Sequence, residues 1–329
     1  MAFLTAAQID QFNAEGYVVV EGLLDPERDL DPIIAEYEGV LDRLAAERYA
    51  AGAISSTYAE LPFSDRLVKI YAESGKVHAQ YFDFSLPQGG VTHETPFWTG
   101  PAVFATLRHE GMLDAMESLI GPEIYSNPVQ HVRLKPPERL TPRDPTTGVV
   151  QLGATPWHQD NGVVNEEADE TDMITVWFPL TEATIENGCL AVVPGSHRAG
   201  LLPHCPASAE NRSGFGVHIR ERHFAHDRSL PLPMKRGTAL IMHRRTVHSS
   251  LSNESDHVRW SFDLRYNPIG QPTGRGAFPG FVARSRSKPE TELRDPAIWT
   301  ELWREARRAL AEGEPPRFNR WDPDSPLCA

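Results

Sequence analysis

Cysteine is scarce in this chain of 329 residues, which holds only Cys189, Cys205 and Cys328. Their number is odd and their spacing fits no zinc-binding pattern. Reduced thiols in a reducing compartment are consistent with this, and the sequence assigns the three cysteines no role. The remaining composition is ordinary for a globular protein, with 40% hydrophobic and 23% charged residues.

Long apolar runs are also missing, since none approaches the ~20 residues that a helix needs to span a bilayer. The N-terminal residues Met1 to Thr5 do not form the basic and apolar regions of a secretory signal. The last residues match no peroxisomal or endoplasmic-reticulum address. A cytoplasmic protein is therefore expected.

Basic residues are outnumbered, and the formal net charge is −13. This balance argues against nucleic acid and against an anionic membrane surface as partners. A small molecule is the expected partner, and the chain is expected to be a monomer or a homodimer.

Helical signals dominate the first third of the chain. Thr5 is a candidate N-cap for a short helix to Phe12, and the β-branched run Tyr17 to Val20 predicts a strand. Apolar residues recur at helical spacing between Leu30 and Ala51. A further helix is expected from Pro101 to Ile120, where Gly121-Pro122 is a stop signal.

From about Ile124 the pattern changes to short β-like runs separated by turns, which is typical of an antiparallel sandwich or barrel. The expected strands are Val129 to Leu134, Ile174 to Leu180, Leu190 to Val193, Thr238 to Met242 and Val258 to Tyr266. Long loops are expected at Pro136 to Gly153 and Leu201 to Pro233. A last amphipathic helix is expected from Pro296 to Ala311, with Trp299 and Trp303 as core or dimer-face residues.

The sharpest chemical signal is the pair His158 and Asp160. On an extended segment, residues two apart project from the same face, so both side chains can reach one ion. An imidazole with a carboxylate suits Fe(II), and one more imidazole would complete a facial triad with open positions. His-x-Asp alone is weak, and spacing leaves two candidates for the third ligand, His243 and His248.

The segment that follows these histidines alternates in character. Val258, Trp260, Phe262 and Leu264 form an apolar face, whereas Arg259, Ser261, Asp263 and Arg265 form the other. We expect both faces to be covered, because the apolar face must pack against something. A buried Arg259 would then need a carboxylate partner, either from the protein or from a dicarboxylate ligand gripped by its planar guanidinium.

The ordered motifs resemble the phytanoyl-CoA dioxygenase family over about residues 4–268. They are His158-Gln159-Asp160, Trp177, Asn187-Gly188-Cys189-Leu190, Pro194-Gly195-Ser196-His197, His248-Ser249-Ser250, Asn253 and Arg259. The resemblance implies a mainly β double-stranded β-helix, a cupin-like jelly roll with flanking helices. It implies one domain over 1–329, with a mostly helical part at 1–123, the jelly-roll core at 124–268 and a C-terminal extension with a helix at 269–329. The implied cofactor is Fe(II), with 2-oxoglutarate and oxygen as co-substrates.

Carried over residue by residue, the resemblance makes His158, Asp160 and His248 the catalytic iron ligands and selects His248 over His243. It implies that Arg259 pairs with the distal carboxylate of 2-oxoglutarate and that Ser250 and Trp177 line the same pocket. Gln130 and Lys135 lie in a segment similar to the family's strand before the first ligand, and both are candidate co-substrate contacts. The family often has Gly-Asp where this chain has Gly237-Thr238, a difference we treat as structural.

The resemblance implies a dioxygenase that oxidises a C–H bond of a small metabolite or natural-product intermediate, releasing succinate and carbon dioxide. Related halogenases lack the carboxylate ligand, so Asp160 disfavours halogenation. Three alternatives stay open: a cupin-type metal enzyme without 2-oxoglutarate, a catalytically silent jelly-roll binding protein, and a zinc hydrolase. A CoA thioester is disfavoured because the sequence shows no clear basic cluster for its phosphates.

Four histidines between residues 201 and 233 offer a second, weaker candidate for a metal site: His204, His218, His223 and His226. Histidines on a polar loop are more often exposed or directed at substrate, and we expect no metal there. His197 is expected at a turn, and the segment with His93, Phe97 and Trp98 is expected to serve packing.

Overall fold

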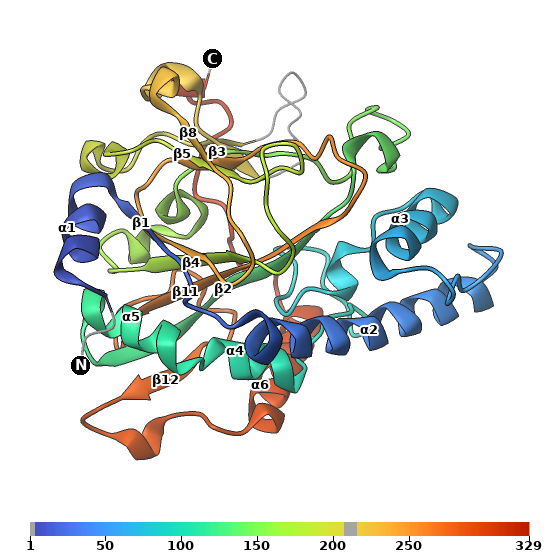
Figure 1. Cartoon of the computed structure of the whole chain (residues 1–329), viewed down its shortest axis with the longest axis horizontal. Helices are drawn as coiled ribbons and strands as arrows, with labels where there is room; N and C mark the ends of the chain where they lie inside the picture. Colours follow the sequence, from blue (N-terminus) through green and yellow to red (C-terminus); the bar gives the residue numbers. More distant parts are fainter. Residues whose placement is uncertain (1–3, 207–215, 329) are drawn as a thin grey trace.

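Two antiparallel sheets, one above the other in Figure 1, form the centre of the computed structural model, which describes residues 4–206 and 216–328. The larger sheet has the order β1-β9-β4-β11-β2-β12 and the smaller one β3-β10-β5-β8. The strands of the larger sheet are β1 (Tyr17–Val20), β2 (Glu123–Lys135), β4 (Ile174–Pro179), β9 (Ala239–His243), β11 (Arg259–Pro268) and β12 (Phe281–Ser285). Those of the smaller sheet are β3 (Thr155–His158), β5 (Leu190–Val192), β8 (Leu230–Leu232) and β10 (His248–Ser250).

A further pair, β6 (Cys205–Pro206) and β7 (Val217–His218), flanks the smaller sheet. Six of the strands, β1, β2, β4, β5, β9 and β11, correspond to the runs expected from the sequence, and the arrangement confirms the predicted jelly roll. The expected long loop at 201–233 contains these two strands, β8 and short 3-10 turns, and its residues 207–215 lie outside the described part of the chain.

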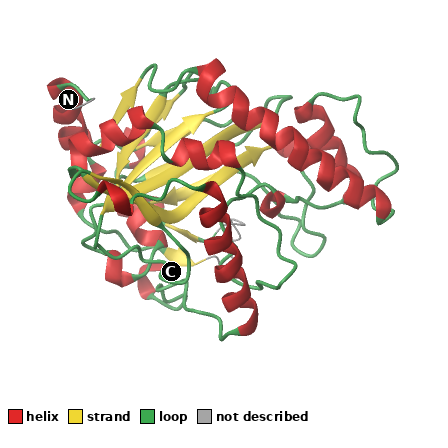
Figure 2. Ribbon diagram, turned by 90° about the horizontal axis from the view of Figure 1, so that it is seen from below, coloured by secondary structure: helices red, strands yellow, loops and turns green. Residues whose placement is uncertain are grey.

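Strand β11 shows why the larger sheet divides the molecule into an apolar and a polar half. Trp260, Phe262 and Leu264 enter the main hydrophobic core, whereas Arg259 and Arg265 face the smaller sheet and are 2% and 4% exposed. Figure 2 shows helices covering the outer face of the large sheet. Both faces of β11 are therefore covered, as its alternating sequence predicts.

The covering helices are α1 (Ala6–Glu15), α2 (Asp31–Ala50), α3 (Phe63–Ser74), α4 (Pro101–Leu107), α5 (Glu110–Ile120) and α6 (Pro296–Glu312). Thr5 caps α1 as expected, accepting a hydrogen bond from the N–H of Gln8. Trp299 and Trp303 of α6 are fully buried in the core, so they do not form a dimer face. Burial of one large apolar side chain contributes about 1.5–3 kcal/mol, which explains why α6 stays docked.

Two details of the helical part differ from expectation. The helix predicted from Pro101 to Ile120 is broken, because His109 leaves the helical conformation and its ring nitrogen accepts the N–H of Met112 to cap α5. Helix α3 was not anticipated, although its buried residues Leu67, Ile70 and Tyr71 follow helical spacing. This helix has only twelve residues, and no side chain caps its N-terminus, so the sequence gives no clear start signal for it.

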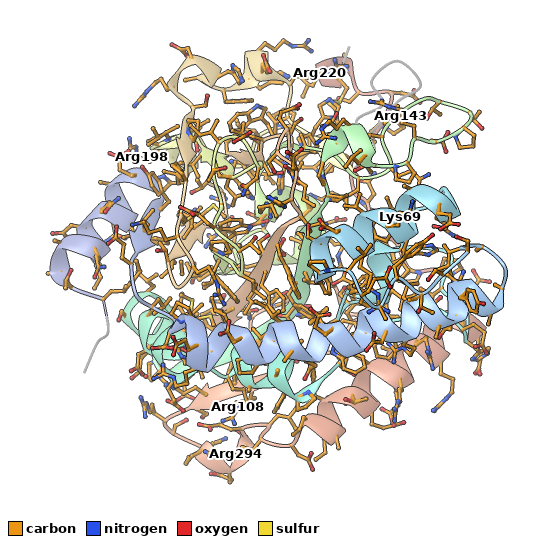
Figure 3. All side chains as sticks on the ribbon, turned by 45° about the vertical axis from the view of Figure 1, so that its right-hand side comes forward. Lys69, Arg108, Arg143, Arg198, Arg220 and Arg294 are labelled. Carbon is orange, nitrogen blue, oxygen red and sulfur yellow. A yellow bond between two sulfur atoms is a disulfide. The ribbon has the colours of Figure 1, made fainter. Side chains whose placement is uncertain are left out.

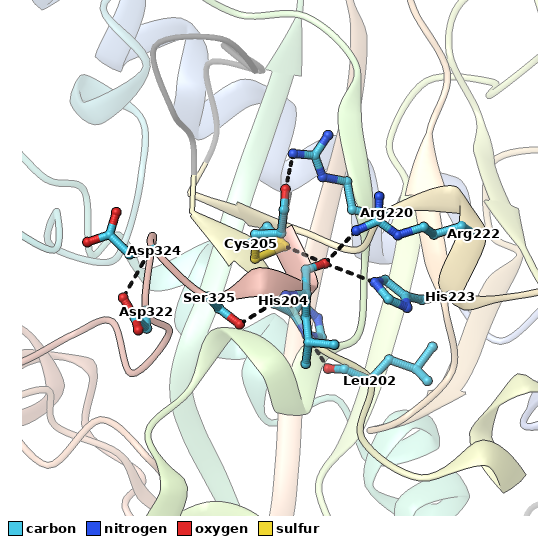
Figure 4. The surroundings of a disulfide bond; sticks show 11 residues. Leu202, His204, Cys205, Arg220, Arg222, His223, Asp322, Asp324 and Ser325 are labelled. Carbon is cyan, nitrogen blue, oxygen red and sulfur yellow. Dashed lines mark hydrogen bonds between the residues drawn. A yellow bond between two sulfur atoms is a disulfide. The ribbon is translucent and has the colours of Figure 1, made fainter.

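The expectation of reduced cysteines without a role is wrong for two of the three. Cys205 and Cys328 form a disulfide across 123 residues, and Cys189 is a buried free thiol. Figure 4 shows the C-terminal residues held beside this bond, where the side chains of Arg222 and His223 contact the carbonyl of Leu327 at 2.9 and 3.1 Å. Sequence spacing could not reveal this pairing, because only the fold brings the tail to the loop.

Across the described residues, no helix combines the length and the apolar character needed to cross a membrane.

Candidate metal and co-substrate site

The jelly roll brings together the three side chains that the sequence singled out as ligands. Strands β3 and β10 pair so that His158 lies opposite His248, and Asp160 follows two residues after His158. The Nε2 atoms of both histidines lie 3.9 Å from Oδ1 of Asp160. One potential ligand atom from each residue lies within 4.8 Å of the others, which is the spacing needed to share one ion.

Each imidazole is oriented by a backbone carbonyl. Nδ1 of His158 lies 2.8 Å from the carbonyl oxygen of Pro156, and Nδ1 of His248 lies 3.0 Å from that of Thr246. Because a carbonyl only accepts, each Nδ1 carries the proton and each Nε2 keeps its lone pair for the shared space. Burial, followed by the neighbouring His248, lowers the pKa of His158 to about 3, which favours the neutral form that a metal requires.

Asp160 is held as a carboxylate by two neighbours. Burial, the largest single effect, raises its pKa, but the charge of Arg265, the neighbouring His248 and His158 and the hydrogen bond from Arg265 together hold the pKa well below its usual range. An N–H of Arg265 donates to Oδ1 at 2.5 Å, and the hydroxyl of Thr175 donates to Oδ2. Asp160 itself is 1% exposed, so these contacts fix both its charge and its orientation.

Arg265 is the centre of a buried charge network. It also contacts Oδ1 of Asp263 at 3.1 Å and the carbonyl of Val129 at 2.6 Å. The sequence placed Arg265 on the inward face of its strand but gave it no role, and it gave none to Thr175. The alternation of β11 was the available signal for Arg265, whereas nothing in the sequence pairs Thr175 with Asp160.

At the other end of the same strand face, Arg259 is buried without an acidic partner. Within the described chain, its side chain donates a hydrogen bond to the hydroxyl of Ser261, its Nε has no partner, and no carboxylate forms an ion pair with it. Burial, then the charge of Arg133, lowers its pKa to about 10, which leaves it protonated. Its guanidinium lies 5.5 Å from the ring centre of Trp177.

Lys135 lies beside Arg259, because the two residues are register partners on β2 and β11. Its ammonium group donates to the hydroxyl of Ser250 at 2.7 Å and to the carbonyl of Leu251 at 2.6 Å. Burial, followed by the charges of Arg259 and Arg133, lowers the pKa of Lys135 well below its ordinary value. Two adjacent buried cations form a place where an anion is strongly favoured.

One cavity connects the carboxylate–histidine cluster with this cationic end. It is lined by Arg133, Thr155, His158, Thr175, Trp177, Leu190, Met242, His248, Ser249, Ser250, Arg259, Asp263 and Arg265. Ser250, Trp177 and Arg259 therefore lie where the resemblance implied. Lys135 reaches the cavity through Ser250. Gln130 is buried but does not line the cavity, and its Oε1 has no partner.

The remaining histidines lie elsewhere. His243 contacts the rings of Phe12 and His197. His204 accepts the N–H of Gln159 at 2.9 Å and stacks on Trp321, so it supports the segment after β3. Over the described ranges 4–206 and 216–328, the cluster of His158, Asp160 and His248 is the one group of three or more such ligands close enough for one ion.

The C-terminal tail closes over the ligand-bearing segment. The indole N–H of Trp321 donates to the carbonyl of Gly162 at 2.6 Å, two residues after Asp160. Arg320 forms an ion pair with Asp169 at 2.5 Å. These contacts, together with the disulfide, attach the tail to the loop that carries Asp160.

Comparison with known proteins supports the same assignment. A sequence profile described as phytanoyl-CoA dioxygenase (PhyH) matches residues 12–261. A phytanoyl-CoA dioxygenase domain-containing protein 1 from Danio rerio is 26% identical over 270 residues, covering 79% of this chain and 88% of that protein. A 1-deoxypentalenic acid 11-beta-hydroxylase from Streptomyces arenae is 33% identical over 128 residues, covering 37% and 44% of the two chains.

Among solved structures, the non-heme monooxygenase ThoJ in its apo form superposes with a TM-score of 0.57 at 20% identity, covering 92% of this chain and 98% of that one. This likeness supports the fold. The profile covers about three quarters of the chain and agrees with the motifs and the ligand cluster. The expected enzyme class and its cofactors, iron(II) with 2-oxoglutarate and oxygen, are therefore confirmed at the level of the family: the chain belongs to the phytanoyl-CoA dioxygenase family.

Proposed function

We propose that this oxygenase oxidises a C–H bond of a small metabolite or natural-product intermediate, with His158, Asp160 and His248 holding the iron and Arg259 holding the distal carboxylate of 2-oxoglutarate. The observation that carries the proposal is the pairing of two features in one cavity. Three neutral or anionic ligands converge at one end, and an unpaired buried guanidinium lies at the other.

The residues fit an iron(II) ion. Two imidazole nitrogens and one carboxylate oxygen form the ligand set expected of a non-haem iron site with open positions. The imidazoles are in the metal-binding tautomer, and Thr175 and Arg265 restrain the carboxylate. Restraint of this kind typically contributes 10–100-fold to metal affinity.

The cationic end fits a dicarboxylate. Arg259 offers a planar fork of N–H donors, and a carboxylate would satisfy its unpartnered Nε. Ser250, already oriented by Lys135, can donate its hydroxyl to the same carboxylate, since Lys135 supplies the proton for the hydroxyl oxygen. Trp177 covers the guanidinium and limits its contact with water.

When bound, iron and 2-oxoglutarate supply the oxidising chemistry, in which the 2-oxo acid is converted to succinate and carbon dioxide. The protein orients both groups and excludes water from them. Asp160 stays ionised because Arg265 compensates its charge, and His158 stays neutral because it is buried. Both side chains are therefore already in the form that binds a metal.

A larger cleft adjoins the cavity and shares His158, Thr155, Arg133 and Arg265 with it. Its cavity volume is about 560 Å³, within the range of pockets that bind small molecules. We place the substrate there, and the C–H bond to be oxidised faces His158.

A compact metabolite fits this cleft better than a CoA thioester does. The N–H donors of Arg265 and Arg275 at the cleft are taken up by internal acceptors, which leaves few of them free to bind phosphates. The labelled cations Lys69, Arg143 and Arg294 are spread over the molecule in Figure 3 and do not gather at one opening. The partial likeness to a hydroxylase named for 1-deoxypentalenic acid supports a substrate of natural-product size.

Anaerobic titration with Fe(II) and then 2-oxoglutarate tests the proposal. The wild-type protein should develop the weak visible charge-transfer band of the chelate, and His158→Ala and Asp160→Ala should not. His243→Gln is a matched control, since it removes a buried imidazole outside the cluster. A band that survives in both ligand variants contradicts the assignment.

The same titration separates the alternatives. A cupin-type enzyme without 2-oxoglutarate would bind iron but give no chelate band, and a zinc hydrolase would prefer zinc under identical conditions. A silent binding protein would bind neither metal when prepared anaerobically. Any of these outcomes would overturn the proposal.

A further inference from the structure

The larger cleft contains a carboxylate that the metal and co-substrate do not use. Asp83 lies between the 3-10 turn Ala79–Tyr81 and α4, and it lines the cleft together with His131 of β2. Oδ2 of Asp83 lies 2.8 Å from Nδ1 of His131. Its other oxygen, Oδ1, is shielded from solvent and has no hydrogen-bond partner among the residues that the structure describes.

An unpartnered carboxylate oxygen in a shielded place is expensive. Leaving a buried acceptor unsatisfied lowers stability, and it does so more when the group is charged. Such an atom in a ligand cleft is a natural acceptor for a donor on the ligand. Asp83 and His131 are only 16% and 22% exposed, so their geometry is set by the protein.

The pair also has a fixed relation to the metal site. His131 is the register partner of Asp263 on β11, and Asp263 contacts Arg265, which holds Asp160. The chain of contacts thus runs from Asp83 in the cleft to the predicted iron ligand. A group bound at Asp83 is therefore linked to the predicted iron ligand through His131 and the pairing of β2 with β11.

The surrounding charges indicate which donor fits. Arg133, Arg265 and Arg275 also line the cleft, so an added ammonium group would meet three guanidinium groups. A hydroxyl brings a donor without a net charge. The rest of the wall is largely apolar, with Leu86, Val129, Val132, Leu134, Leu152 and Val163.

We infer that the substrate is a largely apolar alcohol whose hydroxyl donates to Asp83 in the cleft, with His131 as the residue that positions this carboxylate. The inference rests on the proposed function, because it assumes that the cleft beside His158 holds the substrate. It names Asp83 as a specificity-determining residue. Charge-assisted hydrogen bonds of this kind correspond to roughly tenfold or more in affinity.

The test uses the protein loaded anaerobically with Fe(II) and 2-oxoglutarate and a panel of mono-, bi- and tricyclic alcohols, each paired with its methyl ether. Binding is followed by calorimetry and by the change in the chelate band. Wild-type protein should prefer alcohols to their ethers about tenfold or more, and Asp83→Ala should bind both alike. Asp83→Asn, which keeps an acceptor oxygen, should retain part of the preference.

Asp65→Ala, an exposed aspartate on α3, is the matched control and should behave as wild type. All variants should form the chelate band, so its loss in wild type would count against the proposed function and not against Asp83 alone. Equal binding of alcohols and ethers by wild type, an unchanged preference in Asp83→Ala, or no binding of any alcohol would each overturn the inference.

Discussion

Arg265 and Arg259 stand on one face of one strand, yet their surroundings are opposite. Arg265 contacts two carboxylates and a backbone carbonyl, so its charge is compensated inside the protein. Arg259 is equally buried but has no carboxylate partner in the described chain, and Lys135 lies beside it. We infer that Arg265 supports the metal site, whereas Arg259 binds an anion that the protein itself does not supply.

Replacement of Arg265, whose charge is compensated inside the protein, should have the largest effect on the free energy of unfolding. Arg265→Met leaves Asp160 buried without its cation, while Asp263 keeps its ion pair with Arg133, and breaking a buried pair in this way typically costs about 3–5 kcal/mol. Urea unfolding of the metal-free protein measures this loss. Added Fe(II) should restore part of it, because the metal supplies positive charge to Asp160. A metal-free variant as stable as wild type would contradict the scaffold role.

Replacement of Arg259 should leave the ligand-free protein folded but remove its stabilisation by 2-oxoglutarate. Arg259→Met takes away an uncompensated buried charge, so the unfolding free energy of the free protein should stay constant or rise. In wild type, 2-oxoglutarate at 100 times its dissociation constant should stabilise the metal-loaded protein by about 2.7 kcal/mol. Thermal unfolding should show that this gain is lost in the variant. A variant that keeps the gain would place the co-substrate elsewhere.

The hydrogen bond from Thr175 to Asp160 can be removed without changing any charge. Thr175→Val removes the hydroxyl that donates to Oδ2 while Arg265 remains in place. Because contacts to a ligand tune its orientation, iron affinity should fall about tenfold. Competition with a chromophoric chelator measures the change. Thr171→Val, which alters a buried threonine outside the cavity, should leave the affinity as it is.

His243, which is half-buried, avoids an uncompensated charge inside the protein because it stays neutral. Burial, then the charge of Arg244, lowers the pKa of His243 from 6.5 to about 4. Between pH 6.5 and pH 4, His243 binds a proton in the unfolded chain but not in the folded chain. Protonation therefore favours the unfolded chain, and the free energy of unfolding falls as the pH is lowered from 6.5 towards 4.

The expected loss from His243 between pH 7.5 and pH 5.5 is about 1 kcal/mol. His243→Gln should flatten the pH dependence of the urea midpoint by that amount. Replacement of the exposed His93 by glutamine should not. An identical pH profile in all three proteins would show that His243 titrates normally.

The alternation of β11 and the His-x-Asp pair let the sequence predict the two ends of the site, because both signals are local. What it could not supply are contacts that only the fold creates. Thr175 meets Asp160 across strands, Asp83 reaches His131 over 48 residues, and Cys205 joins Cys328 over 123. The break at His109 was missed because a side-chain cap replaced a turn of helix that propensity allowed.

The central claim is that Arg259 is reserved for the distal carboxylate of 2-oxoglutarate. Anaerobic calorimetry of the iron-loaded protein with 2-oxoglutarate and with 2-oxopentanoate, which has a methyl group in place of that carboxylate, tests it most directly. Wild-type protein should prefer 2-oxoglutarate by about 100-fold, the equivalent of about 2.7 kcal/mol, and Arg259→Met should bind both acids equally weakly. Equal affinity of wild type for the two acids, or a preference that persists in Arg259→Met, would contradict the account.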